Sequence, residues 1–199
     1  MLTDRPPRSK KLRAQFVESD RLRELALPDD RRLRELARAI EEALTDESRA
    51  ACARACTAFV EEAARIFDIP PPEIKVLAAR PQRVYSDGTV ELYGDYNPET
   101  QRLRVWMRTA VKKKVTSYGT FLSTLVHEFC HHLDMVLFGF EDSPHTRGFY
   151  ERTACLYHHA RGTPRKRLSW IKLPRGGYRI DWTKMRASRA PRPSRPPVD

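Results

Sequence analysis

Residues 117–137 read SYGTFLSTLVHEFCHHLDMVL, the longest helical pattern of apolar residues in the chain. Its apolar side chains recur at intervals of three and four residues, as they do on one face of a helix. A hydroxyl side chain at Thr116 or Ser117 can cap the first turn, and Gly139 can end the helix. The breadth of the apolar face predicts a central and mostly buried helix.

The same helix carries two histidines four positions apart, His127 and His131, with Glu128 beside the first. An α-helix turns about 100° per residue, so both imidazoles lie on one face and can bind one metal ion. Glu128 lies one position further round, where its carboxylate can reach a metal-bound water rather than the metal. Two histidine ligands and such a carboxylate are what a zinc peptidase requires.

A catalytic zinc ion takes three protein ligands and keeps one position for water, so a third ligand must come from elsewhere. His132 points about 100° away from His131 and is a poor candidate. The metzincin continuation needs glycine and histidine three and six positions after His131, where this chain has Asp134 and Leu137. That class is therefore excluded.

Two candidates for the third ligand remain. His145 lies in the loop before the next predicted helix, and Glu151 lies inside that helix. Six residues of helix place them about 240° apart, so we do not expect them to share one ion. The spacing by itself leaves both open.

The run HEFCH at 127–131, followed by SPHTRGFY at 143–150, resembles the SprT-like and related minimal zinc metallopeptidases. Those families place a third histidine after a short loop and an aromatic residue about four positions later, as His145 and Phe149 do here. The resemblance covers about residues 55–160. It implies a zinc metalloendopeptidase that hydrolyses a peptide or protein substrate, with Zn²⁺ held by His127, His131 and His145. It also implies Glu128 as general base and an edge strand that aligns an extended substrate.

The rest of the pattern predicts an α+β, zincin-like fold, in which a small antiparallel or mixed sheet packs on the 117–137 helix. We expect helices over 12–27, 33–44, 46–67 (capped by Asp46) and 146–160. We expect strands over 74–78, 89–96 and 102–107, the last two forming an antiparallel hairpin, and a further hairpin over 170–182 around a Gly-Gly turn. The chain then divides into a loose N-terminus (1–11), N-terminal helices (12–67), a zincin-like core (68–162), a basic hairpin (163–184) and a disordered basic tail (185–199).

The net charge of +11 is concentrated near the C-terminus, because residues 161–199 hold twelve Lys and Arg against two Asp. This region is either a site for DNA or RNA, bound by counterion release, or a solvated tail. A second interpretation of the whole chain is therefore a nucleic-acid-binding protein with a structural zinc site. Such a closed site would need a fourth ligand, Glu151 or His158.

The remaining patterns fix less. Four cysteines without a CxxC pair predict free thiols, and with no apolar leader or membrane-length stretch we expect a cytoplasmic protein. The sequence leaves the oligomeric state open. Asp134 is a candidate hydrogen-bond partner of a zinc-ligand histidine. Side chains that could stabilise a developing oxyanion, none singled out by its spacing, are Arg147, Tyr150, Tyr157, His158 and His159.

Overall fold

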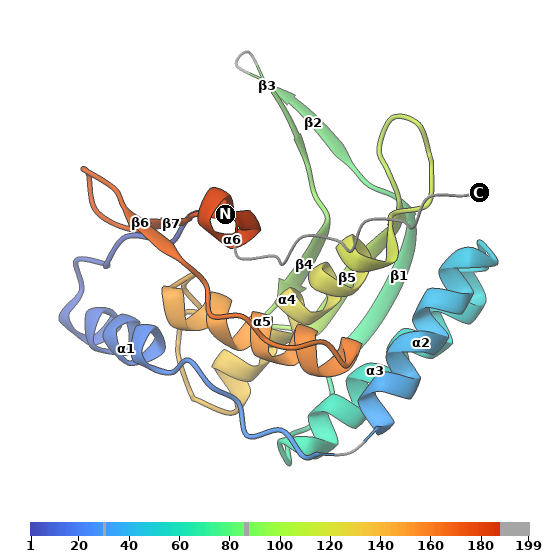
Figure 1. Ribbon diagram of the computed structural model, residues 1–199, viewed down its shortest axis with the longest axis horizontal. Helices are drawn as coiled ribbons and strands as arrows, with labels where there is room; N and C mark the ends of the chain where they lie inside the picture. Colours follow the sequence, from blue (N-terminus) through green and yellow to red (C-terminus); the bar gives the residue numbers. More distant parts are fainter. Residues whose placement is uncertain (30, 86–87, 188–199) are drawn as a thin grey trace, which may run out of the picture.

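The computed structural model describes residues 1–29, 31–85 and 88–187. The described chain is a mixed α+β fold, which confirms the expected fold class at that level (Figure 1). A three-stranded sheet lies beside helix α4 (Tyr118–Val136), and α5 (Arg147–Arg161) packs along α4. The helical hairpin of α2 (Arg32–Thr45) and α3 (Arg49–Ile66) covers β1 and contacts both α4 and α5.

The sheet has the order β1-β5-β4 and is mixed. Strand β5 (Arg102–Arg108) lies in the middle, parallel to β1 (Glu73–Ala79) and antiparallel to β4 (Gly94–Asn97). The predicted 89–96 strand is only half right, because it divides before Gly94. Its first part belongs to β3 (Gly88–Glu91), which pairs with β2 (Gln82–Tyr85) in a separate hairpin. Tyr93 lies in the connection between the β2–β3 hairpin and the β4–β5 pair. The guanidinium carbon of Arg80 lies 3.7 Å from the centre of its ring.

Helix α4 begins where its capping residue predicts. The Ser117 side chain accepts a hydrogen bond from the Thr120 amide, and the apolar residues of its inner face are almost fully buried. Helix α3 begins at a different cap from the expected Asp46. Asp46 ends α2, and the Ser48 side chain accepts from the Ala51 amide at 3.3 Å. The short α2–α3 connection needs both residues, one to end a helix and one to begin the next.

Helix α1 (Lys10–Arg21) ends six residues before the predicted boundary at 27. The Arg152 side chain from α5 donates to the carbonyl oxygens of Ser19, at 2.9 Å, and of Leu22. These carbonyls are therefore satisfied by a guanidinium instead of a further helical turn. The chain can approach so closely because residue 148 is glycine: a Cβ there would lie 1.9 Å from the Ser19 oxygen.

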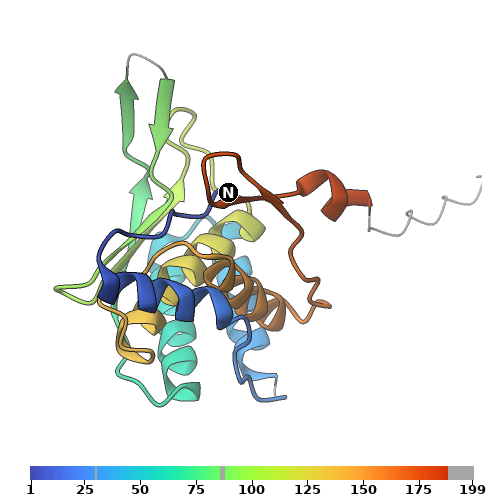
Figure 2. The ribbon, with the colours of Figure 1, turned by 90° about the vertical axis from the view of Figure 1, so that its left-hand side faces the viewer.

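The expectation of a loose N-terminus is wrong for its first residues. Residues 1–4, named here the N-terminal strand, lie along β7 (Tyr178–Ile180), and the Thr3 amide donates to the Tyr178 oxygen at 2.8 Å (Figure 2). Strands β6 (Trp170–Lys172) and β7 form the predicted hairpin, turning at Gly176 and Gly177, which both have positive φ. An isolated bridge between Leu2 and Arg179 thus joins the two-stranded β6–β7 sheet to a segment at the other end of the sequence.

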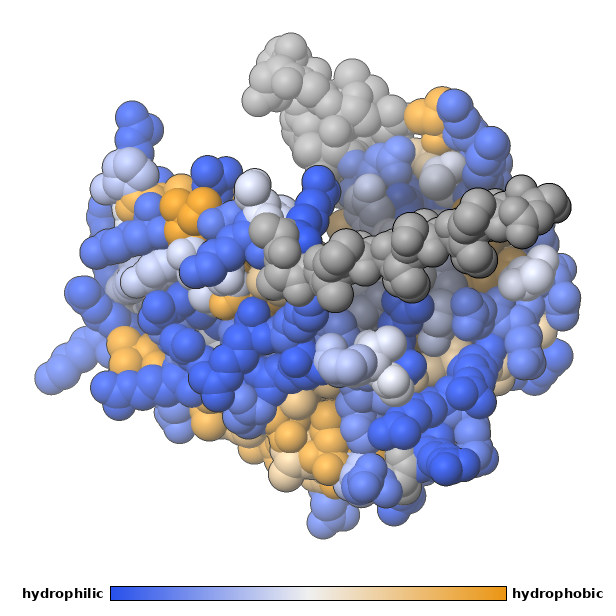
Figure 3. All heavy atoms as spheres, viewed as in Figure 1, coloured by the Kyte–Doolittle hydropathy of each residue, from blue (hydrophilic) through white to orange (hydrophobic). Residues whose placement is uncertain are grey.

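The predicted disordered tail began at residue 185, but helix α6 (Trp182–Ala187) includes residues 185–187. Residues 188–199 lie outside the described part of the chain. Within the described ranges, no helix combines the length and the apolar character needed to cross a membrane. The face in Figure 3 is mainly hydrophilic, with its apolar residues in separate patches.

Gly148→Ala is expected to destabilise the protein by about 3 kcal/mol, because the new methyl group meets backbone oxygens that cannot move independently. The free energy of unfolding from urea denaturation measures this. Gly119→Ala is the control: its Cβ would lie 3.4 Å from the Tyr157 hydroxyl, an ordinary contact within a helix, so its stability should be retained or raised. Equal stability of the two variants would contradict the proposed close approach of α1 and α5.

Candidate metal centre

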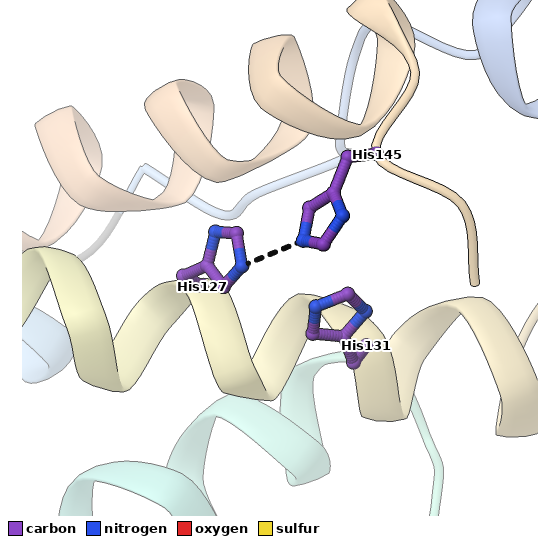
Figure 4. Close-up of side chains that lie close together, drawn as sticks. All are labelled: His127, His131 and His145. Atoms are coloured by element: carbon purple, nitrogen blue, oxygen red, sulfur yellow. Dashed lines mark hydrogen bonds between the residues drawn. The ribbon is translucent and has the colours of Figure 1, made fainter. Parts of the chain in front are cut away.

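Three histidines gather between α4 and the start of α5 (Figure 4). His127 and His131 project from successive turns of α4, and His145 lies in the loop just before α5. Their ligand atoms all lie within 4.8 Å of one another, and Nε2 of His127 is 3.0 Å from Nε2 of His145. Nitrogen ligands of a tetrahedral zinc ion lie about 3.3 Å apart. The cluster therefore has the donor type and nearly the spacing that a zinc ion requires.

The ring of Phe149 packs against all three imidazoles. Its centroid lies 4.5 Å from that of His131, 4.9 Å from His127 and 5.1 Å from His145, and the side chain is fully buried. This aromatic floor restricts the histidine rings from one side. Phe149 is the aromatic residue, four positions after His145, that formed part of the family resemblance.

Burial sets the protonation state of the α4 histidines. It lowers the pKa of His127 to about 3 and that of His131 to about 2, with a smaller contribution from the neighbouring histidines. Both rings are therefore neutral at pH 7. A neutral imidazole has the free lone pair that a metal ligand needs, so no proton has to be displaced from these two residues.

A partly buried chain of polar groups orients His131. Its Nδ1 lies 2.7 Å from Ser143 Oγ, and that hydroxyl donates to Asp134 Oδ2 at 3.0 Å. Because the hydroxyl proton is used on Asp134, Ser143 Oγ accepts from Nδ1–H of His131, which leaves Nε2 free for a metal. Asp134 in turn accepts from Arg152 Nη2 at 2.6 Å. Asp134, a candidate partner from the sequence, thus acts on the histidine through one hydroxyl.

His132 faces away from the cluster, as the helical phase predicts. Its Nε2 donates to the Pro70 oxygen at 2.8 Å, so its Nδ1 accepts from the Tyr96 hydroxyl at 2.9 Å. Both ring nitrogens are used in packing α4 against β4 and against the segment before β1. This histidine is structural.

Glu128 lies against the edge strand β4. A Cβ at Gly94 would lie 2.8 Å from Glu128 Cγ, so a larger residue in the strand would displace the carboxylate. Burial, with a contribution from Asp95, raises the pKa of Glu128 to about 8. No other described residue hydrogen-bonds to this carboxylate. It is held in place by packing and remains available for proton transfer.

The structure brings His145, and not Glu151, close to the other two histidines. Glu151 is turned toward the segment that follows α5, where its carboxylate accepts from Arg165 Nη2 and from the Leu168 amide, both at 3.0 Å. His158 is also elsewhere, with Nδ1 2.8 Å from Thr163 Oγ1. Among the described residues, the histidine triad is the one group of His, Cys, Asp or Glu close enough to hold a metal ion.

Three of the candidate oxyanion donors make other hydrogen bonds. The Tyr150 hydroxyl donates to the Leu2 oxygen at 2.8 Å, and Arg147 Nε donates to Asp20 at 3.0 Å. The Tyr157 hydroxyl accepts from Arg161 at 2.9 Å. The cysteines are free thiols, as expected, and burial raises the pKa of Cys130, inside the motif, to about 12.

Two residues of the site were missed by the sequence analysis. Ser143 is one, and Asp4 is the other: its Oδ2 accepts from the His145 amide at 2.8 Å and lies 3.3 Å from His145 Nδ1. No local spacing connects residue 4 to residue 145. Docking of the N-terminal strand against β7 and Tyr150 brings them together.

Comparison with known proteins adds no assignment, since the chain matches no protein-family model, no curated protein and no solved structure.

We expect His145→Ala to lower zinc affinity at least about 100-fold, because it removes one of the three candidate ligands. Glu151→Gln should retain wild-type zinc affinity, since its carboxylate faces away from the triad. Both variants are compared with wild type by their zinc content after dialysis and by their zinc affinity in chelator competition. Loss of zinc in Glu151→Gln with retention in His145→Ala would reverse the assignment.

Ser143→Ala should lower zinc affinity about 10–100-fold while the protein stays folded, because His131 loses the group that fixes its tautomer and orientation. The same chelator competition measures the loss, and far-UV circular dichroism checks the fold. Ser9→Ala is the control, because Ser9 is an exposed serine before α1 whose side chain makes no capping hydrogen bond. Wild-type affinity in Ser143→Ala would show that the polar chain does not act on the metal centre.

Proposed function

We propose that the protein is a zinc-dependent metalloendopeptidase of the SprT-like, minimal zincin type. The observation that carries the proposal is the convergence of His127, His131 and His145 next to Glu128, which is buried on the same helix and lacks a structural hydrogen bond. Three imidazole donors and one uncommitted carboxylate are the set that zinc-assisted hydrolysis uses.

The residues fit the metal that the resemblance implies. The three histidines would hold a zinc ion, which supplies Lewis-acid polarisation of the scissile carbonyl and a water that ionises near neutral pH. All three are partly exposed, so the triad is accessible to a substrate. The alternative of a closed structural site needs a fourth ligand, and Glu151 and His158 face other partners.

Glu128 is the proposed general base. It accepts a proton from the attacking water and delivers that proton to the nitrogen of the leaving amine, so the carboxylate is regenerated when the peptide bond breaks. Burial raises the pKa of Glu128, and the positive charge of a zinc ion held by the three histidines would oppose this shift and favour the ionised carboxylate that a base requires. The carboxylate also faces a strand edge where a substrate could lie.

Strand β4 offers a place for an extended peptide. It is an edge strand, and no further described strand pairs with its outer side. A peptide that adds to this edge would run past Gly94 and Glu128, and its main-chain groups would pair with those of β4. Binding through the backbone fits a protease that accepts unfolded segments of varied sequence.

Nucleic acid is retained as a proposed second partner of the basic region. The β6–β7 hairpin carries Lys172, Arg175 and Arg179 and no acidic residue between its ends. Such a surface favours a polyanion by counterion release. It would bring the metal centre to substrates that are bound to nucleic acid.

Glu128→Gln is expected to retain zinc and to lower cleavage of a denatured protein substrate by about 10²–10⁴-fold, because the amide cannot accept the proton of the attacking water. Cleavage rate and zinc content are measured on the same preparations. Glu99→Gln, an exposed glutamate beyond β4, serves as the control and should cleave at the wild-type rate. Unchanged cleavage in Glu128→Gln would overturn the proposed mechanism.

A further inference from the structure

The N-terminal strand is attached to the candidate metal centre at residue 145. The Asp4 amide donates to the His145 oxygen at 2.9 Å, and Asp4 Oδ2 accepts from the His145 amide at 2.8 Å. The same carboxylate oxygen lies 3.3 Å from His145 Nδ1. Asp4 therefore contacts both the backbone and the ring of the third histidine.

His145 needs such support more than the other two histidines do. His127 and His131 are fixed by the backbone of α4, whereas His145 lies in the loop between α4 and α5. A loop residue keeps its position only if its neighbours hold it. Phe149 contacts its ring on one side, and Asp4 contacts Nδ1 at the ring edge.

We propose that Asp4 is a positioning residue of the metal centre, and that zinc affinity depends on docking of the N-terminal strand onto β7. This inference rests on the proposed function, because it assigns Asp4 a role toward the metal of the same site. The carboxylate holds the Nδ1–H tautomer of His145 and so directs the Nε2 lone pair toward His127 and His131. The Ser143 hydroxyl has the equivalent task at His131.

The position of Asp4 is set by contacts of the residues before it. Thr3 exchanges two bonds with Tyr178: its amide donates to the Tyr178 oxygen, and its hydroxyl accepts from the Tyr178 amide, both at 2.8 Å. The Tyr150 hydroxyl holds the Leu2 oxygen at 2.8 Å, and its ring lies 5.8 Å from that of His145 in a stacked orientation. The C-terminal hairpin is thereby coupled to the third metal ligand.

A series of variants at Asp4 tests the proposal by zinc affinity, measured by chelator competition on the full chain. Asp4→Ala is expected to weaken zinc binding about tenfold or more. Asp4→Asn, which keeps an acceptor for the His145 amide but loses the charge, should fall between Asp4→Ala and wild type. Asp142→Ala is the matched control, because Asp142 is an exposed carboxylate of the same loop and should leave affinity unchanged.

Thr3→Pro distinguishes the effect of docking the N-terminal strand from the effect of the Asp4 carboxylate itself. Proline removes the amide and hydroxyl that pair with Tyr178 but leaves Asp4 in the chain, so zinc affinity should fall as it does in Asp4→Ala. Coupling between the sites is reciprocal. Zinc should therefore slow hydrogen exchange of the wild-type Thr3 and Asp4 amides, and NMR of the metal-free and zinc-loaded protein measures this.

The outcomes separate the two proposals. If the wild-type protein binds no zinc, or if His127→Ala and His131→Ala bind it normally, the proposed function fails. If wild type binds zinc and cleaves while Asp4→Ala and Thr3→Pro bind zinc as tightly, only the role of the N-terminal strand is overturned. An equal loss in Asp142→Ala would also overturn it, because a general effect of negative charge would then explain the result. Circular dichroism of each metal-free variant confirms that the comparison is between folded proteins.

Discussion

The buried ion pair between Arg152 and Asp134 is the constraint on which the site depends. Both side chains are completely buried, and they connect α5 to α4. An uncompensated charge at such a place costs about 3–5 kcal/mol, so neither helix can shift without a large penalty. The guanidinium also satisfies the carbonyl oxygens at the end of α1, and the second oxygen of Asp134 holds Ser143. One pair of charges thus fixes three helices and a partner of a candidate metal ligand.

The sequence predicted what depends on local geometry. The phase of one helix was enough to bring His127 and His131 together and to turn His132 away. The same reasoning separated His145 from Glu151, although it could not choose between them. That choice depends on Arg165 and the Leu168 amide, which hold the glutamate from a segment with no periodic pattern of its own.

The features that were missed depend on pairing between distant segments. The parallel alignment of β1 with β5 joins residues 29 positions apart, Glu73 with Arg102, and no turn signal marks it. The N-terminal strand is too short to show alternation, and its partner lies at the other end of the chain. Asp4 belongs to the site through this non-local pairing, so no motif search within a window could have found it. Helix α1 was predicted too long for a related reason, since its end is set by a side chain from α5.

The approach of β4 to α4 has a consequence for where a bound peptide would be cut. Gly94 faces Glu128, and two residues later Tyr96 faces His132, four residues further along the helix. Two residues of strand advance about 6.6 Å and four residues of helix about 6.0 Å, so the two pairs of facing residues are separated by nearly the same distance along the strand and along the helix. A peptide paired with β4 would have the same two-residue repeat of about 6.6 Å. If it shifted along β4 by two residues, its scissile bond would therefore move by that distance away from the Glu128 carboxylate. Pairing with the β4 backbone would then determine which peptide bond lies next to Glu128. The position of that bond along the strand would matter more than the peptide's side chains.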